Sequence, residues 1–431
     1  MLDILGIGFG PSNLALAIQM HELNVFENKK VKFIEKKNSF VWQPGLLLPN
    51  TNLQIHFLKD LVTLINPCSK FTFINYLNEN GRLLDFINLN ISCPSRFEFN
   101  DYLTWAASQF SEFVIYNSYI KNIIPVVLSG EIQYFNVSYI IDNEEFNLDA
   151  KNIILASGRS PKKPDIFSHE YDGISIIHSD KFTSTDLFEK TKQEKDGFSK
   201  VAIVGAGQSA AEIFNHLIEN MGSNVKLYNF IRGYGYNPSD SSPFRNQVFN
   251  PEFVDVFFQL EKNYQKEILN KLSNTNYSVV DSDLIEEIYT KLYHMRHIEK
   301  SDKATILSMT EIEKVERTFD NKINLTYKDK LTGISNIETL DYIILATGYD
   351  QVFIKNKYFI EFNELLDQKN NGEIQLNRDY SVKFKVPSTS KIFLQGYSES
   401  THGLSDSLIS VIANRANIIA KSLMLKEVIN K

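Results

Sequence analysis

Cysteine is scarce in this sequence. Its 431 residues include two, Cys68 and Cys93, which lie far apart along the chain. Two thiols cannot build a disulfide scaffold or a four-thiolate metal site, and these two do not form the Cys-x-x-Cys pair of a redox motif. So little cysteine fits a reducing compartment, and we expect the protein to work in the cytoplasm.

Long apolar runs are missing as well. No stretch of about 18 apolar residues occurs, so the sequence predicts no transmembrane helix. The N-terminus shows neither a basic region followed by an apolar run nor a small-residue cleavage site, which are the marks of a secretory signal peptide. We therefore expect no membrane partner.

An excess of positive charge is absent too. The chain carries 45 lysines and arginines against 52 aspartates and glutamates, a formal net charge of −7. This balance offers no broad basic surface for a phosphate backbone, which argues against nucleic acid as a partner. With 43% hydrophobic residues and no low-complexity segment, the chain can form a sizeable core, and its length predicts two or three domains.

What the sequence does contain is a strand–glycine–helix pattern, present twice. In the first copy an apolar strand over 2–5 leads into a glycine turn and then a helix from Asn13. Such a turn lets backbone N–H groups approach a pyrophosphate at a helix N-terminus. The next strand, 31–35, ends in Glu35, an acid that can accept hydrogen bonds from a ribose diol. The turn residues that we expect to bind the dinucleotide are Gly6, Gly8, Gly10 and Pro11, with Pro11 in the place of the third glycine. The alternative is an ordinary glycine-rich turn with a surface glutamate.

The second copy begins at Lys200 and differs at one informative position. Here the strand after the glycine turn ends in Arg232 rather than in an acid. Arginine suits a 2′-phosphate, which an acid would repel, so this copy predicts NADPH rather than NADH. The alternative for Arg232 is a solvated charge at a strand end. The turn residues of this copy are Gly205, Gly207, Gln208 and Ser209, of which the last two are expected phosphate or nicotinamide contacts.

Two such units in one chain predict an α/β fold of two nested Rossmann-like dinucleotide-binding folds. A first site that ends in an acid suits FAD, and an inner site that ends in arginine suits NADPH. The similar turns 156–158 and 346–348 mark the expected crossings between them. We expect an FAD-binding domain (1–160 and 341–431), an NADPH-binding domain (161–236 and 301–340) and a smaller, mainly helical substrate region (237–300). An amphipathic helix is expected over 407–424.

The class of flavin chemistry is narrowed by missing motifs. A disulfide reductase needs a cysteine pair beside the flavin, which this chain lacks. The FxGxxxHxxxW motif of Baeyer–Villiger monooxygenases is present only in a loosened form, with Tyr171, Gly173, His178 and Phe182. The histidines are not spaced as metal ligands, so we expect no metal site.

Several segments resemble the ornithine/lysine N-hydroxylating monooxygenases of siderophore biosynthesis. The most specific are Gln-x-x-Phe-Leu-Lys-Asp-Leu at 54–61 and His-Gly-Leu-Ser at 402–405, the latter closer to the ornithine branch. The similar segments are 4–14, 53–64, 71–77, 96–105, 242–246, 249–252, 275–277, 346–349 and 402–408. The resemblance implies that NADPH reduces FAD, that oxygen adds to give a flavin hydroperoxide, and that a neutral primary amine attacks its distal oxygen.

The resemblance also implies roles for individual side chains in the middle of the chain. Lys59 would hold the substrate carboxylate, and Gln54 would lie at the reactive edge of the flavin. Asn246 would contact substrate, and Asn276 would lie near both substrate and nicotinamide, so Gln54 and Asn276 are the expected catalytic residues. The alternatives are a surface lysine paired with Asp60, an exposed glutamine, and turn or cap asparagines.

Near the C-terminus, the residues before the last helix are expected at the flavin ring. Ser405 would face substrate, with an N-cap as the alternative for it or for Ser407. Trp42 is a candidate wall of the flavin pocket, although core packing is the favoured explanation. Besides the glycine turn and Gln54, the residues implied for FAD binding are Ser12, Glu35, Trp42, His402, Leu404, Ser407 and Leu408.

Taken together, the sequence predicts an FAD- and NADPH-dependent N-monooxygenase that hydroxylates the terminal amine of a small molecule, with O2 as co-substrate. L-Ornithine is the first choice of substrate, and lysine, putrescine, cadaverine and histamine are the alternatives. A flavoprotein redox sensor without turnover and a monooxygenase of sulfur or carbonyl carbon remain open. The resemblance implies a homo-oligomer, a tetramer or dimer, with the aromatic-rich region 53–110 as a possible interface.

Overall fold

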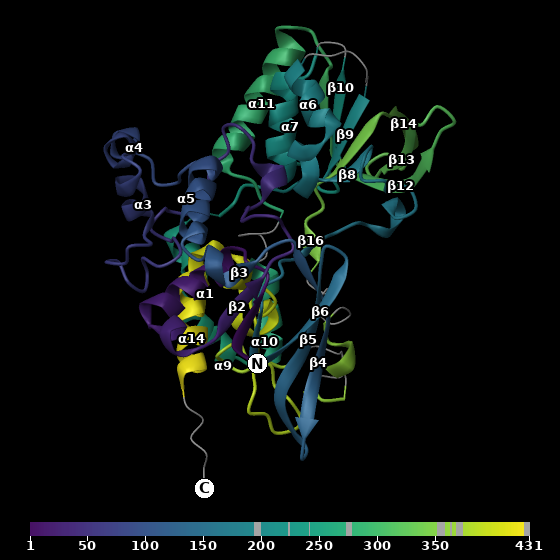
Figure 1. Ribbon diagram of the computed structural model, residues 1–431. Helices are drawn as coiled ribbons and strands as arrows, with labels where there is room; N and C mark the ends of the chain where they lie inside the picture. The colour runs from purple at the N-terminus through teal and green to yellow at the C-terminus, as the bar shows by residue number, and fades with distance from the viewer. Residues whose placement is uncertain are drawn as a thin grey trace.

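In the computed structural model the chain opens with the central strand of a seven-stranded sheet. The structure describes residues 1–193, 200–222, 225–240, 242–272, 278–350, 358–362, 364–367 and 374–425. Within this part the strand order is β3-β2-β1-β6-β5-β4, with β17 also paired to β6 (Figure 1). The strands are β1 Leu2–Ile7, β2 Val31–Ile34, β3 Val114–Ile115, β4 Ser118–Leu128, β5 Glu131–Ile141, β6 Glu144–Leu155 and β17 Ile392–Leu394.

Helices cover one face of this first sheet because their sequences are apolar toward it. Residues 13–20 of α1 are all buried, since this helix lies between the sheet and the C-terminal helix α14. The other face packs against the segments around Phe362 and Leu376. The helices of this half are α1 Pro11–Glu22, α2 Val25–Asn28, α3 Phe73–Glu79, α4 Leu83–Leu89, α5 Arg96–Ser108, α13 Glu399–His402 and α14 Ile412–Met424.

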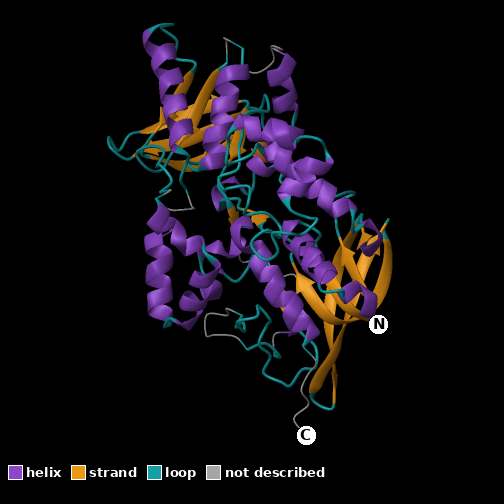
Figure 2. Ribbon diagram, turned by 90° about the vertical axis from the view of Figure 1, so that its left-hand side faces the viewer, coloured by secondary structure: helices purple, strands orange, loops and turns teal. Residues whose placement is uncertain are grey.

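A second sheet of five parallel strands forms the other half of the molecule, in the order β11-β10-β9-β15-β8. Figure 2 shows this second group of strands in the upper part of the molecule, with helices beside it. Helices α6, α7 and α11 pack on one face, and a three-stranded antiparallel sheet packs on the other. The strands are β8 Ile176–His178, β9 Lys200–Val204, β10 Lys226–Phe230, β11 Ala304–Leu307 and β15 Tyr342–Leu345, followed by the small sheet of β12 Thr310–Arg317, β13 Ile323–Asp329 and β14 Ser335–Leu340. The helices are α6 Asp186–Gln193, α7 Gln208–Asn220 and α11 Ser282–His297.

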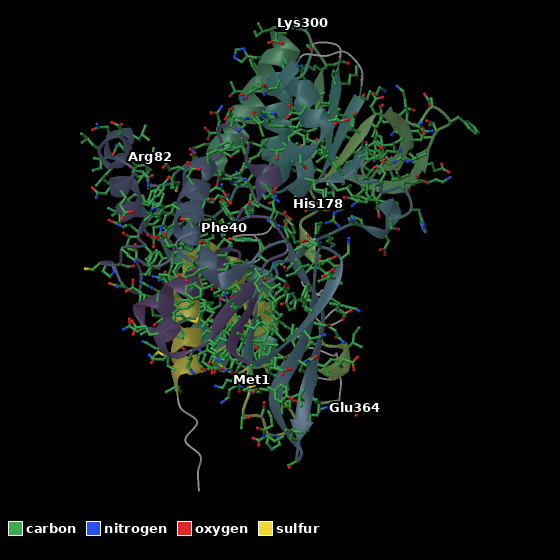
Figure 3. All side chains as sticks on the ribbon, viewed as in Figure 1. Met1, Phe40, Arg82, His178, Lys300 and Glu364 are labelled. Atoms are coloured by element: carbon green, nitrogen blue, oxygen red, sulfur yellow. The ribbon has the colours of Figure 1, made fainter. Side chains whose placement is uncertain are left out.

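The two chain passages between the halves lie side by side. Strand β7, Ser160–Pro161, pairs antiparallel with β16, Tyr349–Asp350, directly after the turns 156–158 and 346–348 that were expected to mark the crossings. His178 lies where the halves meet, and its Nε2 is 3.0 Å from the carbonyl oxygen of Gly348 (Figure 3). The predicted fold class is therefore confirmed: two α/β units, with the second between β6 and β17 of the first.

The region expected as one helical unit, 237–300, is divided between the two halves. Helices α9 and α10 contact α13, whereas α11 packs against α7 with its apolar side. Strand β15 lies in the second sheet, so the return to the first sheet comes after Gly348, later than the expected boundary at 341. The helices that precede α11 are α8 Pro243–Asn246, α9 Pro251–Gln259 and α10 Lys262–Leu272.

The expected helix over 407–424 begins later than predicted. The α-helix starts at Ile412, because Leu408 is extended, with φ −99° and ψ 151°. Residues Leu404–Ser407 and Ile409–Val411 form 3₁₀ turns instead, labelled η8 and η9. The other short turns are η1 Pro44–Leu46, η2 Ser111–Phe113, η3 Asp165–Phe167, η4 Ser179–Ser184, η5 Gln247–Phe249 and η7 Ile360–Phe362. None of the helices in the described ranges has the length and hydropathy of a bilayer span.

Candidate functional site

The first glycine turn joins β1 to α1 and leaves the helix N-terminus open. Gly8 has φ +82°, and a Cβ there would lie 2.5 Å from the carbonyl oxygen of Ala156, so only glycine fits this position. At Gly10, by contrast, a Cβ would meet nothing within 4 Å. Gly10 is the N-cap of α1 and provides no side-chain cap, and Pro11 opens the helix. Backbone N–H groups of this first turn can therefore serve a phosphate, as the sequence predicts.

Glu35 lies directly after β2, beside this turn. Its Oε2 accepts the N–H of Phe9 at 2.6 Å, and its Oε1 accepts the N–H of Lys37 at 2.9 Å. The carboxylate is thus fixed by the turn itself. That it also accepts hydrogen bonds from a ribose remains a prediction, because each oxygen keeps a second lone pair.

The second glycine turn repeats this arrangement between β9 and α7. Gly205 has φ +147°, and its Cβ would lie 2.3 Å from the carbonyl oxygen of Ala346. Gly207 is the N-cap of α7, again without a side-chain cap. Arg232 is exposed after β10, on the same edge of the sheet as the turn, and Ser209 lies in the first turn of α7. The positions suit a dinucleotide phosphate and a 2′-phosphate.

A chain of polar contacts runs between the two turns. Gln54 Nε2 donates to Asp281 Oδ1 at 2.9 Å, and Gln208 Nε2 donates to Asp281 Oδ2 at 3.2 Å. Gln208 also donates to Glu212 Oε1 at 2.9 Å, and Glu212 forms a bidentate pair with Arg96, with both distances 2.8 Å. The structure therefore brings together Gln54 and Gln208, which belong to different predicted cofactor sites.

Sequence reasoning missed three residues of this series of polar contacts. Arg96 lies in a segment with family resemblance but received no role, and Glu212 and Asp281 were not considered. A signal existed for Glu212, because it stands among Ala210, Ala211 and Ile213 on the buried side of α7. Burial raises the pKa of the Glu212 carboxyl, while the Arg96 guanidinium acts in the opposite direction.

Lys59 is half-buried and does not form the surface pair that was the alternative to a substrate contact. Asp60 accepts hydrogen bonds from the N–H groups of Val62, Thr63 and Phe73 at 2.7–2.9 Å and from the Thr63 hydroxyl at 2.7 Å. Burial raises the pKa of Asp60, against these hydrogen bonds. Within the described ranges Lys59 forms no ion pair, so its charge can meet a ligand carboxylate.

Asn246 and Ser405 come from distant parts of the sequence to neighbouring turns. Asn246 ends α8, directly before η5, and η5 contacts η8, which contains Ser405. The Ser405 hydroxyl is buried and, in the part of the chain that the structure describes, has no hydrogen-bond partner. A buried hydroxyl without a partner is costly, so it fits a site that a polar ligand completes. Asn276 lies outside the described residues, and its expected role is not tested.

The side chain of His402 is held by protein contacts. Its ring stacks on Tyr380 at a centroid distance of 4.0 Å, and its Nδ1 lies 2.8 Å from the Thr401 hydroxyl. Its Nε2 is 3.2 Å from the carbonyl oxygen of Arg378, and a carbonyl only accepts, so this nitrogen carries the proton. Burial lowers the pKa of His402 to about 4. Any part it plays in FAD binding therefore falls to its backbone.

The remaining candidates for FAD binding differ in exposure. Leu404 is buried, Leu408 is half-buried, and Ser407 is exposed. Because α14 begins only at Ile412, neither Ser405 nor Ser407 is its N-cap. Trp42 packs against the first core and meets Phe99 edge-on at 5.9 Å, which favours core packing as the explanation for it.

A buried ion pair connects the first turn to η8. Arg415 of α14 donates to Asp406 Oδ1 at 2.9 Å and to the Ser12 hydroxyl at 2.9 Å. Ser12 was predicted as an FAD contact, and the structure places its hydroxyl on this guanidinium. Among the described residues no group of histidine, cysteine, aspartate or glutamate is placed to hold a metal ion.

The chain is similar over nearly its whole length to proteins of one family. The family model described as L-lysine 6-monooxygenase/L-ornithine 5-monooxygenase matches residues 1–351. A curated L-ornithine N(5)-oxygenase of Arthrobotrys oligospora is 38% identical over 438 residues, which cover 99% of this chain and 89% of the relative.

Ornithine hydroxylases are among the solved structures with the same arrangement. Ornithine hydroxylase PvdA from Pseudomonas aeruginosa superposes with a TM-score of 0.90 at 36% identity, covering 98% of each chain. The Kutzneria sp. 744 ornithine N-hydroxylase KtzI, solved with reduced FAD, NADP+ and L-ornithine, also gives 0.90, at 33% identity, covering 98% of this chain and 99% of that one.

Proposed function

Because the chain belongs to the L-lysine 6-monooxygenase/L-ornithine 5-monooxygenase family, we propose that it hydroxylates the terminal amine of L-ornithine. It is a flavin-dependent N-hydroxylating monooxygenase that uses FAD, NADPH and O2. The observation that carries the choice of ornithine is the higher similarity to ornithine enzymes, with 36% identity and a TM-score of 0.90 for the ornithine hydroxylase of Pseudomonas aeruginosa against 27% and 0.84 for the L-lysine 6-monooxygenase of Pseudomonas syringae.

The residues at both glycine turns fit the two cofactors. The open N-terminus of α1 and the fixed carboxylate of Glu35 would hold the FAD pyrophosphate and ribose. The N-terminus of α7 and the exposed Arg232 would hold the phosphates of NADPH. When bound, FAD that has been reduced by NADPH supplies the oxygen chemistry, and the protein binds, orients and excludes water.

The substrate would be held by its polar ends. We assign the carboxylate of ornithine to Lys59, whose charge has no ion-pair partner within the described ranges. The turn segments of Asn246 and Ser405 adjoin, and the buried Ser405 hydroxyl would gain a partner from substrate. Asn276 remains a proposed contact to substrate and nicotinamide. His402 is not placed to act as a base, since both of its ring nitrogens face protein groups, the Thr401 hydroxyl and the Arg378 carbonyl.

We propose further that the product feeds hydroxamate siderophore biosynthesis in the cytoplasm and that the enzyme is a homo-oligomer. Exposed apolar side chains on α4, Leu84, Ile87 and Leu89, support an interface in the 53–110 region. Light scattering on the protein as it elutes from a gel-filtration column would give the number of subunits in the assembly. Ile87→Asp should lower this number. A monomer at micromolar concentration would contradict the proposed assembly.

A panel of amines tests the substrate. L-Ornithine, lysine, putrescine, cadaverine and histamine are compared by hydroxylamine release and by NADPH oxidation in the same sample. We expect hydroxylamine to match NADPH oxidised with ornithine and to fall short with the others. NADPH oxidation with every amine and hydroxylamine with none would refute the hydroxylase assignment.

A variant of Lys59 separates carboxylate recognition from general binding. Lys59→Ala should raise the KM for ornithine about 10- to 100-fold, the loss of one charge-assisted contact, and leave that for putrescine nearly unchanged. Lys70→Ala, which removes an exposed lysine nearby, is the matched control. Equal effects of Lys59→Ala on both amines would contradict the assignment.

The two open alternatives have their own signatures. A redox sensor without turnover would be purified as a protein that NADPH does not bleach. A monooxygenase of sulfur or carbonyl carbon would give sulfoxide or ester products and no hydroxylamine. The loosened motif around His178 speaks against the latter, because Tyr171 and Phe182 replace its first phenylalanine and its tryptophan.

A further inference from the structure

Asp281 occupies an unusual place between the two halves of the molecule. It directly precedes α11 as its N-cap residue, yet its carboxylate makes no capping hydrogen bond. Instead, its two oxygens accept from two glutamines, Gln54 in the first half and Gln208 in the second. Its own N–H donates to Gln208 Oε1 at 2.9 Å. One residue thus contacts both predicted cofactor sites.

The carboxylate decides which way each amide is turned. A carboxylate only accepts, so the Nε2 end of both glutamines must face Asp281. Gln208 is fixed further, because its Oε1 accepts from the Asp281 N–H and its Nε2 also donates to Glu212. Among the described residues Gln54 has one side-chain hydrogen bond, to Asp281, so we assign its carbonyl oxygen as an acceptor for the flavin side.

The far end of this arrangement is anchored in the first half again. Glu212 of α7 pairs with Arg96, the first residue of α5, and both side chains are at most 10% exposed. Arg96 also donates to the carbonyl oxygen of Leu46 at 3.4 Å. The contacts therefore run from α5 to α7, to Asp281 and back to Gln54. Such a closed path fixes the N-terminus of α7 relative to the first glycine turn.

We propose that Asp281 is a positioning residue that sets the amide orientation of Gln54 at the flavin and holds Gln208 at the NADPH turn. It does not touch the reacting atoms. This inference rests on the proposed function, since the roles of Gln54 and Gln208 belong to it. Its consequence is that the orientations of both glutamine amides depend on one carboxylate and respond differently to its replacement.

Asparagine and alanine at this position should give different results. The side chain introduced by Asp281→Asn would keep one acceptor oxygen for Gln208, whose orientation is fixed, and would turn its NH2 to Gln54. The Gln54 amide would then reverse to accept, and present NH2 to the flavin in place of oxygen. Alanine would remove both bonds to the carboxylate, and Gln208 would keep only its bonds to the backbone N–H at position 281 and to Glu212. Asp281→Asn should therefore disturb Gln54 alone, and Asp281→Ala should disturb both glutamines.

The test uses the FAD-loaded enzyme and three variants, Asp281→Ala, Asp281→Asn and Asp283→Ala. Asp283 is an exposed acid in the first turn of α11 and serves as the control for loss of charge. Calorimetric titration with NADP+ is expected to show about tenfold weaker binding for Asp281→Ala only. Anaerobic bleaching of the flavin by saturating NADPH should slow by a similar factor in that variant.

Coupling is the second readout. The fraction of NADPH oxidised that appears as hydroxylamine should fall at least threefold in both Asp281 variants and not in Asp283→Ala. In a Gln54→Ala background, Asp281→Asn should lower coupling no further, because the residue through which it acts is gone.

Two outcomes overturn the inference. One is an Asp281→Ala variant whose NADP+ affinity and coupling are the same as those of Asp283→Ala. The other is Asp281→Asn that lowers coupling as much with Ala at position 54 as with Gln. If the wild type makes no hydroxylamine from any amine, the proposed function fails, yet the NADP+ titrations still decide whether Asp281 holds the NADPH turn.

Discussion

Asp406→Ala should destabilise the protein far more than the loss of an ordinary surface charge. Asp406 and Arg415 form an ion pair with side chains 0% and 1% exposed, at 2.9 Å. Asp406 also accepts the N–H and the hydroxyl of Ser398, both at 2.7 Å. The guanidinium has further bonds to Gln395, at 3.2 Å, and to Ser12. The pair therefore ties α14 to η8 and to the first turn of α1.

The magnitude follows from what the substitution leaves behind. Removing the carboxylate leaves the buried guanidinium of Arg415 without its counter-ion, which costs about 3–5 kcal/mol. The N–H of Ser398 loses its acceptor as well, which adds about 1–3 kcal/mol. In a cooperative unit of about 150–250 residues, a loss of about 1 kcal/mol lowers the melting temperature by about 2–4 °C. We therefore expect a drop on the order of 10 °C or more.

Differential scanning calorimetry at fixed FAD concentration is the assay, because FAD binding itself shifts the midpoint. Asp101→Ala is the control, since Asp101 pairs with Arg82 at 3.4 Å in an exposed position, where such pairs contribute about 0–1 kcal/mol. The double variant Asp406→Leu/Arg415→Met removes both charges and should lose less stability than Asp406→Ala. A midpoint for Asp406→Ala within about 2 °C of that for Asp101→Ala would refute the reasoning, as would a double variant that loses the sum of both single effects.

Three further predictions concern other positions. Arg232→Ala should raise the KM for NADPH about 10- to 100-fold in steady-state assays and change that for NADH little, and equal changes would remove the case for a 2′-phosphate contact. For His402 the folded pKa of about 4 lies below the ordinary 6.5, so the unfolded chain binds a proton first as the pH falls, and up to about 3 kcal/mol of stability is lost between pH 6.5 and 4. Melting temperatures across that range should fall more steeply for wild type than for His402→Gln. Gly205→Ala should lower the melting temperature, because its Cβ would meet the Ala346 carbonyl, whereas Gly207→Ala, whose nearest contact is 3.6 Å, should fold normally and weaken NADP+ binding; similar stability of both variants would contradict this difference.

The features that could be predicted from the sequence are those that depend on short, continuous segments. Each glycine turn lies between an apolar strand and a helix within about twenty residues, so both could be located, and Glu35 and Arg232 could be placed beside them. The paired crossings followed from two similar turns. Such local patterns also predict where residues lie in space, because neighbouring parallel strands have their carboxyl ends at the same edge of the sheet.

The parts that it could not reach depend on contacts between distant residues. Arg96 and Glu212 are 116 positions apart, and Gln54 and Asp281 are 227 apart, so no local pattern pairs them. The start of α14 was predicted too early because the amphipathic pattern of its sequence runs on through two 3₁₀ turns. The division of 237–300 between the halves was missed for the same reason: helical periodicity does not say which surface a helix covers.

The pairing of β7 with β16 has a consequence for how such a chain is assembled and how it can be dissected. The chain leaves the first sheet and returns beside its own exit, with Tyr349 opposite Pro161. The seven described strands of the first sheet all lie outside 162–348. A stretch whose ends adjoin can be cut out and the gap bridged by a short linker without stretching what remains. Removing 162–348 would therefore leave the seven strands and the first glycine turn together, but it would also remove α9 and α10, which contact α13 in the first half.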